Sequence, residues 1–156
     1  MTFRKILVAL DRLFDAQAVF EQAINIAKND ASTLLLVSYL PWKPSARSEA
    51  ESTFNATPAF SRAGLELDAL KMELERAQEM LRGYQAEAKA LGLKASVRCD
   101  VGNPSEMICA KAKDWGVDLI IMGRQDRKGL TELVLGRVSN DVLHHAHCSV
   151  LVIQGA

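Results

Sequence analysis

Glycines and basic residues gather in one segment near the C-terminus, GRQDRKGLTELVLGRVSND, at residues 123–141. Glycine leaves backbone N–H groups open to an oxygen ligand, and the first turn of a helix adds a positive dipole end. Gly123 opens the segment, and Gly136 and Ser139 stand at the start of an expected helix. Between Gly123 and Arg137, four basic residues outnumber two acidic ones, namely Arg124, Arg127, Lys128 and Arg137 against Asp126 and Glu132. The segment therefore predicts an anion site, with a solvated basic turn as the alternative.

Short apolar runs alternate with amphipathic stretches and predict the elements that position this segment. We expect strands at residues 5–10, 33–39, 95–101, 117–122 and 149–154. We expect helices at residues 14–28, 67–91, 104–115 and 137–145, with a short helical stretch that ends at residue 135. This order predicts an α/β fold, a doubly wound five-stranded parallel sheet with helices on both faces, Rossmann-like. Ligands of such sheets bind beyond the carboxyl ends of the strands, where Asp11 follows the first strand and Gly123 the fourth.

The residue pattern in the middle of the chain predicts a loop, a long helix and an edge strand. Residues 41–64 hold three of the four prolines and show no sustained period, which predicts a long loop. Apolar residues then recur at three- and four-residue steps from Leu67 to Leu91, and Gly92 closes the predicted helix. The same spacing suits a coiled coil, but alanine fills two of its eight positions, so packing on the sheet is favoured. Strand 95–101 alternates apolar and polar residues, as an edge strand does.

Composition sets the broad class. The 156 residues fit one domain, 1–156, and the 49% hydrophobic and 24% charged fractions exclude wholesale disorder. Nineteen basic residues balance nineteen acidic ones, so no overall field attracts nucleic acid or a membrane surface. No apolar run is long enough for a signal peptide or a spanning helix. Three widely spaced cysteines predict a reducing compartment, and we expect a cytoplasmic protein.

Other chemistries have weaker support. His144, His145, His147 and Cys148 could bind a metal, but adjacent helical residues diverge by about 100°, so we expect no metal. Dinucleotide and P-loop glycine motifs are both missing from the sequence. A phosphoacceptor receiver domain would need an acidic pocket, and Asp11 has no acidic neighbour in its loop. We therefore expect no enzymatic activity.

Four segments, taken together, resemble the universal stress protein family. They are KILVALD near the start, GNPSEMI after the third strand, VDLIIMGRQ after the fourth, and LGRVSNDVLHHAHCSVLVI at the end. The resemblance spans nearly the whole chain. It implies strand order 3-2-1-4-5 and a homodimer in which the last strand pairs with its copy. Binding members carry a phosphate motif of glycine, two residues, glycine, nine residues, glycine, then Ser or Thr.

The resemblance assigns site residues one by one. Gly123 and Gly136 match the first and last glycines, whereas Asp126 replaces the middle glycine and Arg137 replaces the Ser or Thr. Ser139 offers a hydroxyl two residues later. The resemblance also implies that Asp11 lies near the nucleoside, and that Ser38 stands where the family often has an aliphatic residue beside the base.

These departures leave three hypotheses for the site. A carboxylate near a phosphate is repulsive by a few kcal/mol, on the order of 4 at 4 Å in a partly screened site. Arg137 could offset this by pairing with the phosphate. The first hypothesis is weak or altered binding of ATP or AMP. The second is a nucleotide-independent protein-interaction module in which Asp126 pairs with Arg137, and the third is a different anionic ligand.

Overall fold

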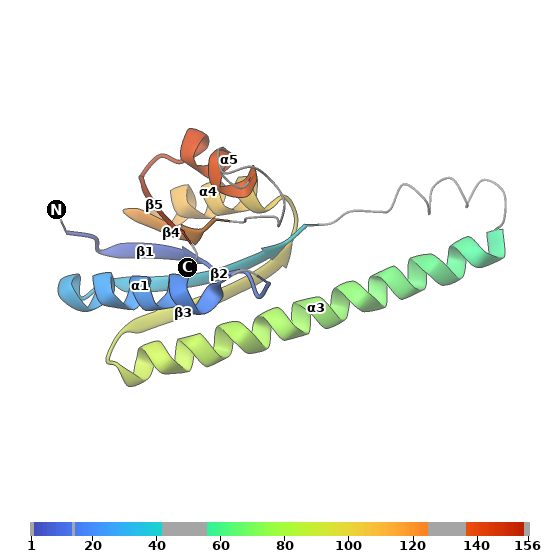
Figure 1. The fold of residues 1–156 in the computed structure, drawn as a ribbon, viewed down its shortest axis with the longest axis horizontal. Coiled ribbons are helices and arrows are strands. Elements are labelled where there is room, and N and C mark those ends of the chain that lie inside the picture. The colour runs from blue at the N-terminus through green and yellow to red at the C-terminus, as the bar shows by residue number, and fades with distance from the viewer. Residues whose placement is uncertain (1, 14, 42–55, 125–136, 155–156) are drawn as a thin grey trace.

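A computed structural model gives the fold of the chain (Figure 1). It describes residues 2–13, 15–41, 56–124 and 137–154, and of residues 56–63 the backbone alone. The strands are β1 (Lys5–Ala9), β2 (Thr33–Leu40), β3 (Lys94–Val101), β4 (Leu119–Gly123) and β5 (Ser149–Ile153). The helices are α1 (Ala16–Asp30), α3 (Ala56–Ala90), α4 (Pro104–Trp115) and α5 (Arg137–His145).

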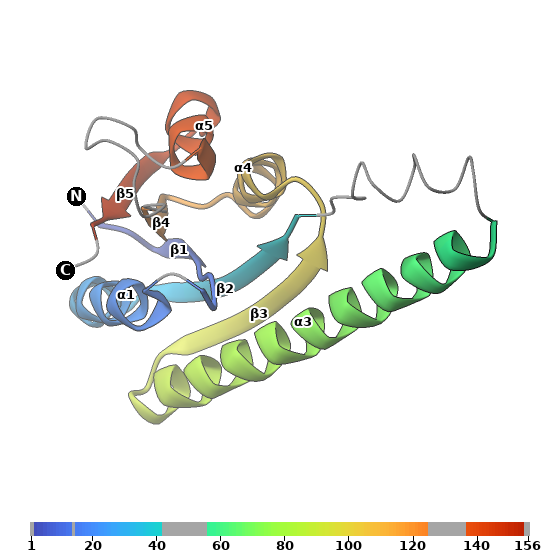
Figure 2. The ribbon, with the colours of Figure 1, turned by 45° about the vertical axis from the view of Figure 1, so that its right-hand side comes forward.

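The strands form one parallel sheet in the order β3-β2-β1-β4-β5. Figures 1 and 2 show α1 and α3 on one face of the sheet and α4 and α5 on the other. The doubly wound fold and its strand order are thus confirmed, with β3 as the predicted edge strand. The exposed and half-buried alternation along β3 fits that position, because an edge strand keeps one face partly in water.

Strand alternation divides the core into two clusters. Ile6 and Val8 of β1 pack with α1 and α3, whereas Leu7, between them, packs with α4 and α5. Successive side chains of a strand point to opposite faces. The central strands are therefore apolar on both faces, and this explains the uninterrupted hydrophobic runs of the sequence.

Helix α3 is longer than the sequence predicts. The predicted stripe is confirmed where the helix crosses the sheet, since Ala77, Leu81 and Ala88 are buried. The predicted loop over 41–64 is wrong from Ala56 onward, and residues 42–55 lie outside the described part. Pro58 falls in the first helical turn, where backbone N–H groups have no partner within the helix, so a proline is tolerated there.

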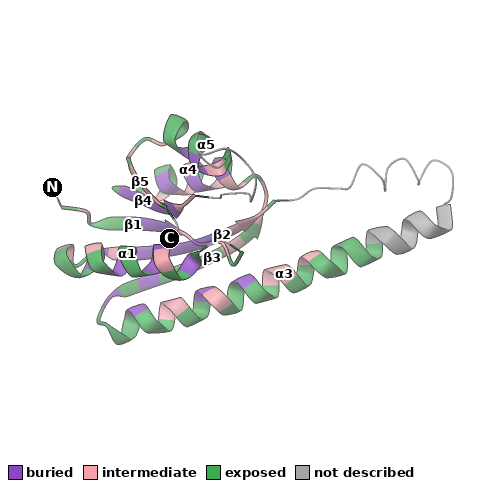
Figure 3. Ribbon diagram, viewed as in Figure 1, coloured by how far each residue is buried: buried purple, intermediate pink, exposed green. Residues whose placement is uncertain are grey.

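The early part of α3 extends past the sheet (Figures 1 and 2). Burial follows this arrangement: residues 64–69 are all exposed, and buried positions begin at Ala77 (Figure 3). Gly92, with a φ of 83°, follows the helix and donates its N–H to the Lys89 carbonyl at 2.9 Å. This confirms the predicted glycine at the helix end.

The turn from β3 into α4 also agrees with prediction. The Asn103 side chain caps α4 by accepting a hydrogen bond from the Glu106 N–H at 3.3 Å, and Pro104 is the first helical residue. Gly102 precedes the cap and lies close to the Met107 sulfur, so a side chain at position 102 would collide with it. None of the described helices is long and apolar enough to cross a bilayer.

Candidate functional site

The turns after β1 and β4 lie side by side at the carboxyl edge of the sheet. The two strands pair directly, with Ala9 opposite Met122, so Asp11 and Gly123 follow neighbouring strand ends. Gly123 is opposite Ile153, whose carbonyl accepts the Arg124 N–H at 3.1 Å. The structure thus brings together the two turns on which the predicted site depends.

Asp11 shapes the turn in which it lies. One of its carboxylate oxygens, Oδ1, accepts the Leu13 N–H at 2.9 Å, the local bond of an Asx turn. The backbone returns close to Asp11 at Asp15, which has a left-handed φ of 41° just before α1. The prediction that Asp11 has no acidic neighbour in its loop is therefore wrong, because α1 begins at Ala16 and leaves Asp15 in the turn. Asp11 is half-buried, so its carboxylate is placed by the turn at the rim of the sheet.

Ser38 and Ser139 lie on opposite faces of the sheet. Ser38 is buried on β2, and by strand alternation it shares the face of Leu34 and Leu36, which pack with α1 and α3. Ser139 is buried in α5, near Val142 of the other cluster. A small ligand on one face of the sheet could therefore contact only one of the two hydroxyls. A ligand that contacts both would have to pass over the carboxyl edge of the sheet.

The remaining predicted residues divide between described and undescribed parts. Arg137 is exposed and is the first residue of α5. Asp126 and Gly136 lie outside the described residues, as does the short helical stretch predicted to end at Leu135. The predicted helix 137–145 is confirmed, and its amino end carries Arg137.

A polar link that the sequence did not predict joins α4 to α5. Ser105 is 7% exposed, and its hydroxyl lies 2.9 Å from the Asn103 side-chain oxygen and 3.4 Å from an Asp141 carboxylate oxygen. A single hydroxyl proton can serve either acceptor. The link fixes α5 against the start of α4, and so it positions the helix that begins at Arg137.

Burial alters the acidity of the cysteine thiols and of one tyrosine. Burial is the main cause that raises the pKa of Cys99, Cys109 and Cys148, so all three thiols stay protonated at neutral pH. The pKa of Tyr39, at the end of β2, is raised first by burial and then by the nearby Asp100 carboxylate. These shifts favour core roles for the cysteines, because the thiolate is the nucleophile.

The histidines near residue 145 fit the end of a helix. His145 Nδ1 lies 2.8 Å from the Asp141 carbonyl oxygen, to which an N–H tautomer donates. Imidazoles at this position also meet the negative end of the helix dipole. Within the part of the chain that the structure describes, no three His, Cys, Asp or Glu side chains are grouped to hold a metal ion.

Comparisons with known proteins agree with this geometry. A family model described as "Universal stress protein family" matches residues 2–154. Universal stress protein Sll1388 of Synechocystis is 34% identical over 99% of both chains. The solved universal stress protein UspA from Lactobacillus plantarum superimposes with a TM-score of 0.77 at 26% identity, covering 98% of this chain and 99% of its own. An Arabidopsis thaliana universal stress protein solved with AMP bound gives 0.63 at 18%, covering 98% and 92%.

Proposed function

We propose that this chain, which belongs to the universal stress protein family, binds an adenine nucleotide at the carboxyl edge of β1 and β4. One observation carries the proposal: the turn at Asp11 and the turn at Gly123 follow directly paired strands. An adenosine group would lie beside Asp11, and the phosphates would extend toward the amino end of α5. The AMP named for the Arabidopsis neighbour supports this ligand class.

Two side chains, Arg137 and Ser139, would contact the phosphates. Arg137 is exposed at the start of α5, so its guanidinium can pair with a phosphate at the positive end of the helix dipole. Ser139 is the third residue of α5, within its first turn, and would supply a hydroxyl close to the same end. Asp126 opposes phosphate binding by its charge, and we therefore propose an affinity below that of a complete glycine motif.

The proposed role is binding and signalling in the stress response of the cytoplasm, without catalytic turnover. Occupancy of the site would change the surface formed by the rim and α5, and a partner would recognise that surface. Raised thiol pKa values support a binding role over cysteine-based catalysis.

We further propose a homodimer through β5. This strand has β4 on one side and is the last strand of the described sheet, so its other edge offers unpaired backbone groups. Val150 and Val152 face one cluster and Leu151 and Ile153 the other, and all four are half-buried. Pairing of β5 with its copy would cover these groups in a two-fold contact.

Calorimetric titration with ATP and AMP tests the nucleotide proposal. Wild type is compared with the double variant Asp126→Gly, Arg137→Ser, which restores the family's phosphate motif. The proposal predicts weak binding by wild type and tighter binding by the variant. A matched control, Lys5→Ser at the opposite end of β1, should titrate like wild type. If neither wild type nor the double variant takes up nucleotide, the protein-interaction module, in which Asp126 pairs with Arg137, replaces this proposal.

A further inference from the structure

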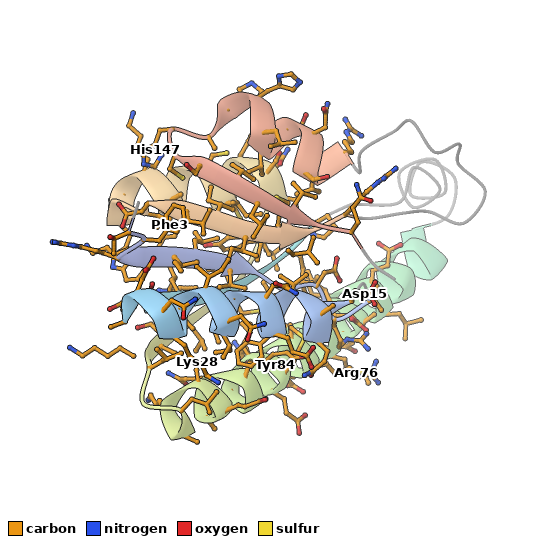
Figure 4. The ribbon with its side chains drawn as sticks, turned by 60° about the vertical axis from the view of Figure 1, so that its left-hand side comes forward. Phe3, Asp15, Lys28, Arg76, Tyr84 and His147 are labelled. Carbon is orange, nitrogen blue, oxygen red and sulfur yellow. The ribbon has the colours of Figure 1, made fainter. Side chains whose placement is uncertain are left out.

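A shallow groove runs along α3 on the side of the sheet away from α4 and α5. It has a volume of about 550 Å³ and is bounded by Arg12 of the turn after β1 and by one face of α3. Figure 4 shows Arg76 and Tyr84 on the part of α3 that passes beside α1. The groove lies outside the set of residues assigned to nucleotide binding.

The lining positions of α3 form a symmetric set. They are Arg76, Glu79, Met80, Gly83, Tyr84 and Glu87. Their steps of three and four residues place them on one side of the helix, next to the stripe of Leu81 and Ala88 that packs on the sheet. Met80 and Tyr84 also pack partly against the core, where the centroid of the Tyr84 ring lies 4.4 Å from that of Phe20 in α1. Each member has a counterpart at equal distance from the point between residues 81 and 82. An antiparallel copy of α3 crossing at that point would face each residue with its counterpart.

The facing residues are chemically complementary. Arg76 would meet Glu87 of the second copy, which pairs opposite charges. Met80 would meet Gly83, where the absence of a side chain leaves a notch for the thioether. A parallel pairing would instead place Arg76 against Arg76, which is repulsive.

This face of α3 is positive at the end near Arg76 and negative at the end near Glu87, as an antiparallel pairing requires. Arg12 Nη2 lies 2.9 and 2.6 Å from the two Glu73 oxygens, and Arg76 Nη1 lies 3.2 Å from one of them. Two guanidinium groups thus share one carboxylate, which leaves one positive charge at this end. Glu79 and Glu87 supply negative charge farther along the helix. Antiparallel copies therefore attract at both ends.

Gly83 has no evident role in the isolated chain. It is exposed in the interior of a 35-residue helix, and a Cβ built on it would meet nothing within 4 Å. Glycine destabilises a helix interior relative to alanine, so the fold of one copy does not require it. Close approach of a second helix does require a small residue at the crossing point.

We propose that α3 of a second copy of this chain docks antiparallel in this groove, on a two-fold axis between residues 81 and 82. The contact does not use β5, so it adds to strand pairing and does not compete with it. Together the two contacts would build assemblies larger than a dimer.

Sedimentation velocity of charge variants tests the proposal. Glu87→Arg and Arg76→Glu each create a repulsive pair, and each is expected to halve the mass of the wild-type assembly at the same concentration. An equimolar mixture of the two variants should restore the wild-type mass, because every altered charge then faces its opposite. Arg82→Glu, on another face of α3, is the control and should leave the mass unchanged.

A size variant separates loss of contact from loss of folding. Gly83→Leu fills the notch, and it is expected to halve the mass while the far-UV circular dichroism spectrum of the native fold is kept, since leucine favours a helix more than glycine does. The proposal is overturned by a mass that stays at the wild-type value in Glu87→Arg or Gly83→Leu. It is overturned equally by a mixture that fails to recover, or by a wild type that sediments as a monomer.

Discussion

Leu81 and Leu67 belong to the same stripe of α3 but lie in different surroundings. Leu81 is 1% exposed against the sheet, whereas Leu67 is 45% exposed on the part of the helix that extends past it. Leu81→Ala removes a buried side chain and leaves a cavity, which should lower the free energy of unfolding by about 3 kcal/mol. In a chain of this size that loss corresponds to a drop of roughly 6–12 °C in the midpoint.

Leu67→Ala is the matched control for this prediction. The side chain already keeps nearly half of its surface in water and its loss opens no cavity, so we expect about 1 kcal/mol or less. Urea unfolding of both variants at one protein concentration measures the difference. Equal losses would refute the reasoning, because they would mean that the whole stripe is packed against a partner helix, as in a coiled coil.

The remaining predictions concern a cap, a charge, an edge and the thiols. Asn103→Ala removes the cap of α4 and should lower the free energy of unfolding by about 1 kcal/mol. Asn103→Asp keeps an oxygen acceptor and should leave the free energy of unfolding unchanged. Urea unfolding of the two variants measures the difference. The hydrogen bond from Arg12 is the main cause that holds the pKa of Glu73 below its usual value. The carboxylate therefore contributes stability above its unfolded pKa, and the contribution is lost as the pH falls through the folded pKa. Wild type and Glu73→Gln should differ in unfolding midpoint at neutral pH and converge in acid, and a constant difference would contradict this. Val152→Lys should halve the mass of the assembly in sedimentation, unless β5 takes no part in it. Burial raises the pKa of all three thiols, so a thiol reagent should react slowly with the native protein and faster in denaturant; equal rates would argue against buried roles.

Local signals in the sequence predicted much of the fold. The Asn103 cap, the stripe through Leu81 and the glycine at position 92 each depend on residues within a turn or two of one another, and all three are confirmed. The start of α3 was missed because proline usually marks a break. Pro58 lies in the first turn, where its missing N–H costs little.

The site depends on contacts between distant parts of the chain. Ser105 and Asp141 are 36 residues apart, and Arg12 and Glu73 are 61 apart. No local period links either pair, so only the packing of α4 on α5, or of α3 beside the first turn, brings them together. The meeting of Asp11 and Gly123 was predictable, because it follows from the direct pairing of two parallel strands.

Ser38 shows the limit of assigning roles position by position. Ser38 is two and four residues from Leu36 and Leu34, so the sequence shows that all three point to one face of the strand. The sequence alone does not show which face α5 covers. Crossovers between parallel strands are almost always right-handed, so the face that a helix covers follows once the strand order is known, and the resemblance alone supplied that order. The structure therefore adds the finding that the two serines flank the rim from opposite sides.

Amide chemical shifts of the protein during titration with AMP test the central claim most directly. Binding at the rim should shift residues 11–13, 123–124 and 137–139, which surround the joined ends of β1 and β4, and should leave Arg4 and Lys5 at the other end of β1 unchanged. Saturable shifts confined to other parts of the molecule, or no shift at millimolar AMP, would contradict it.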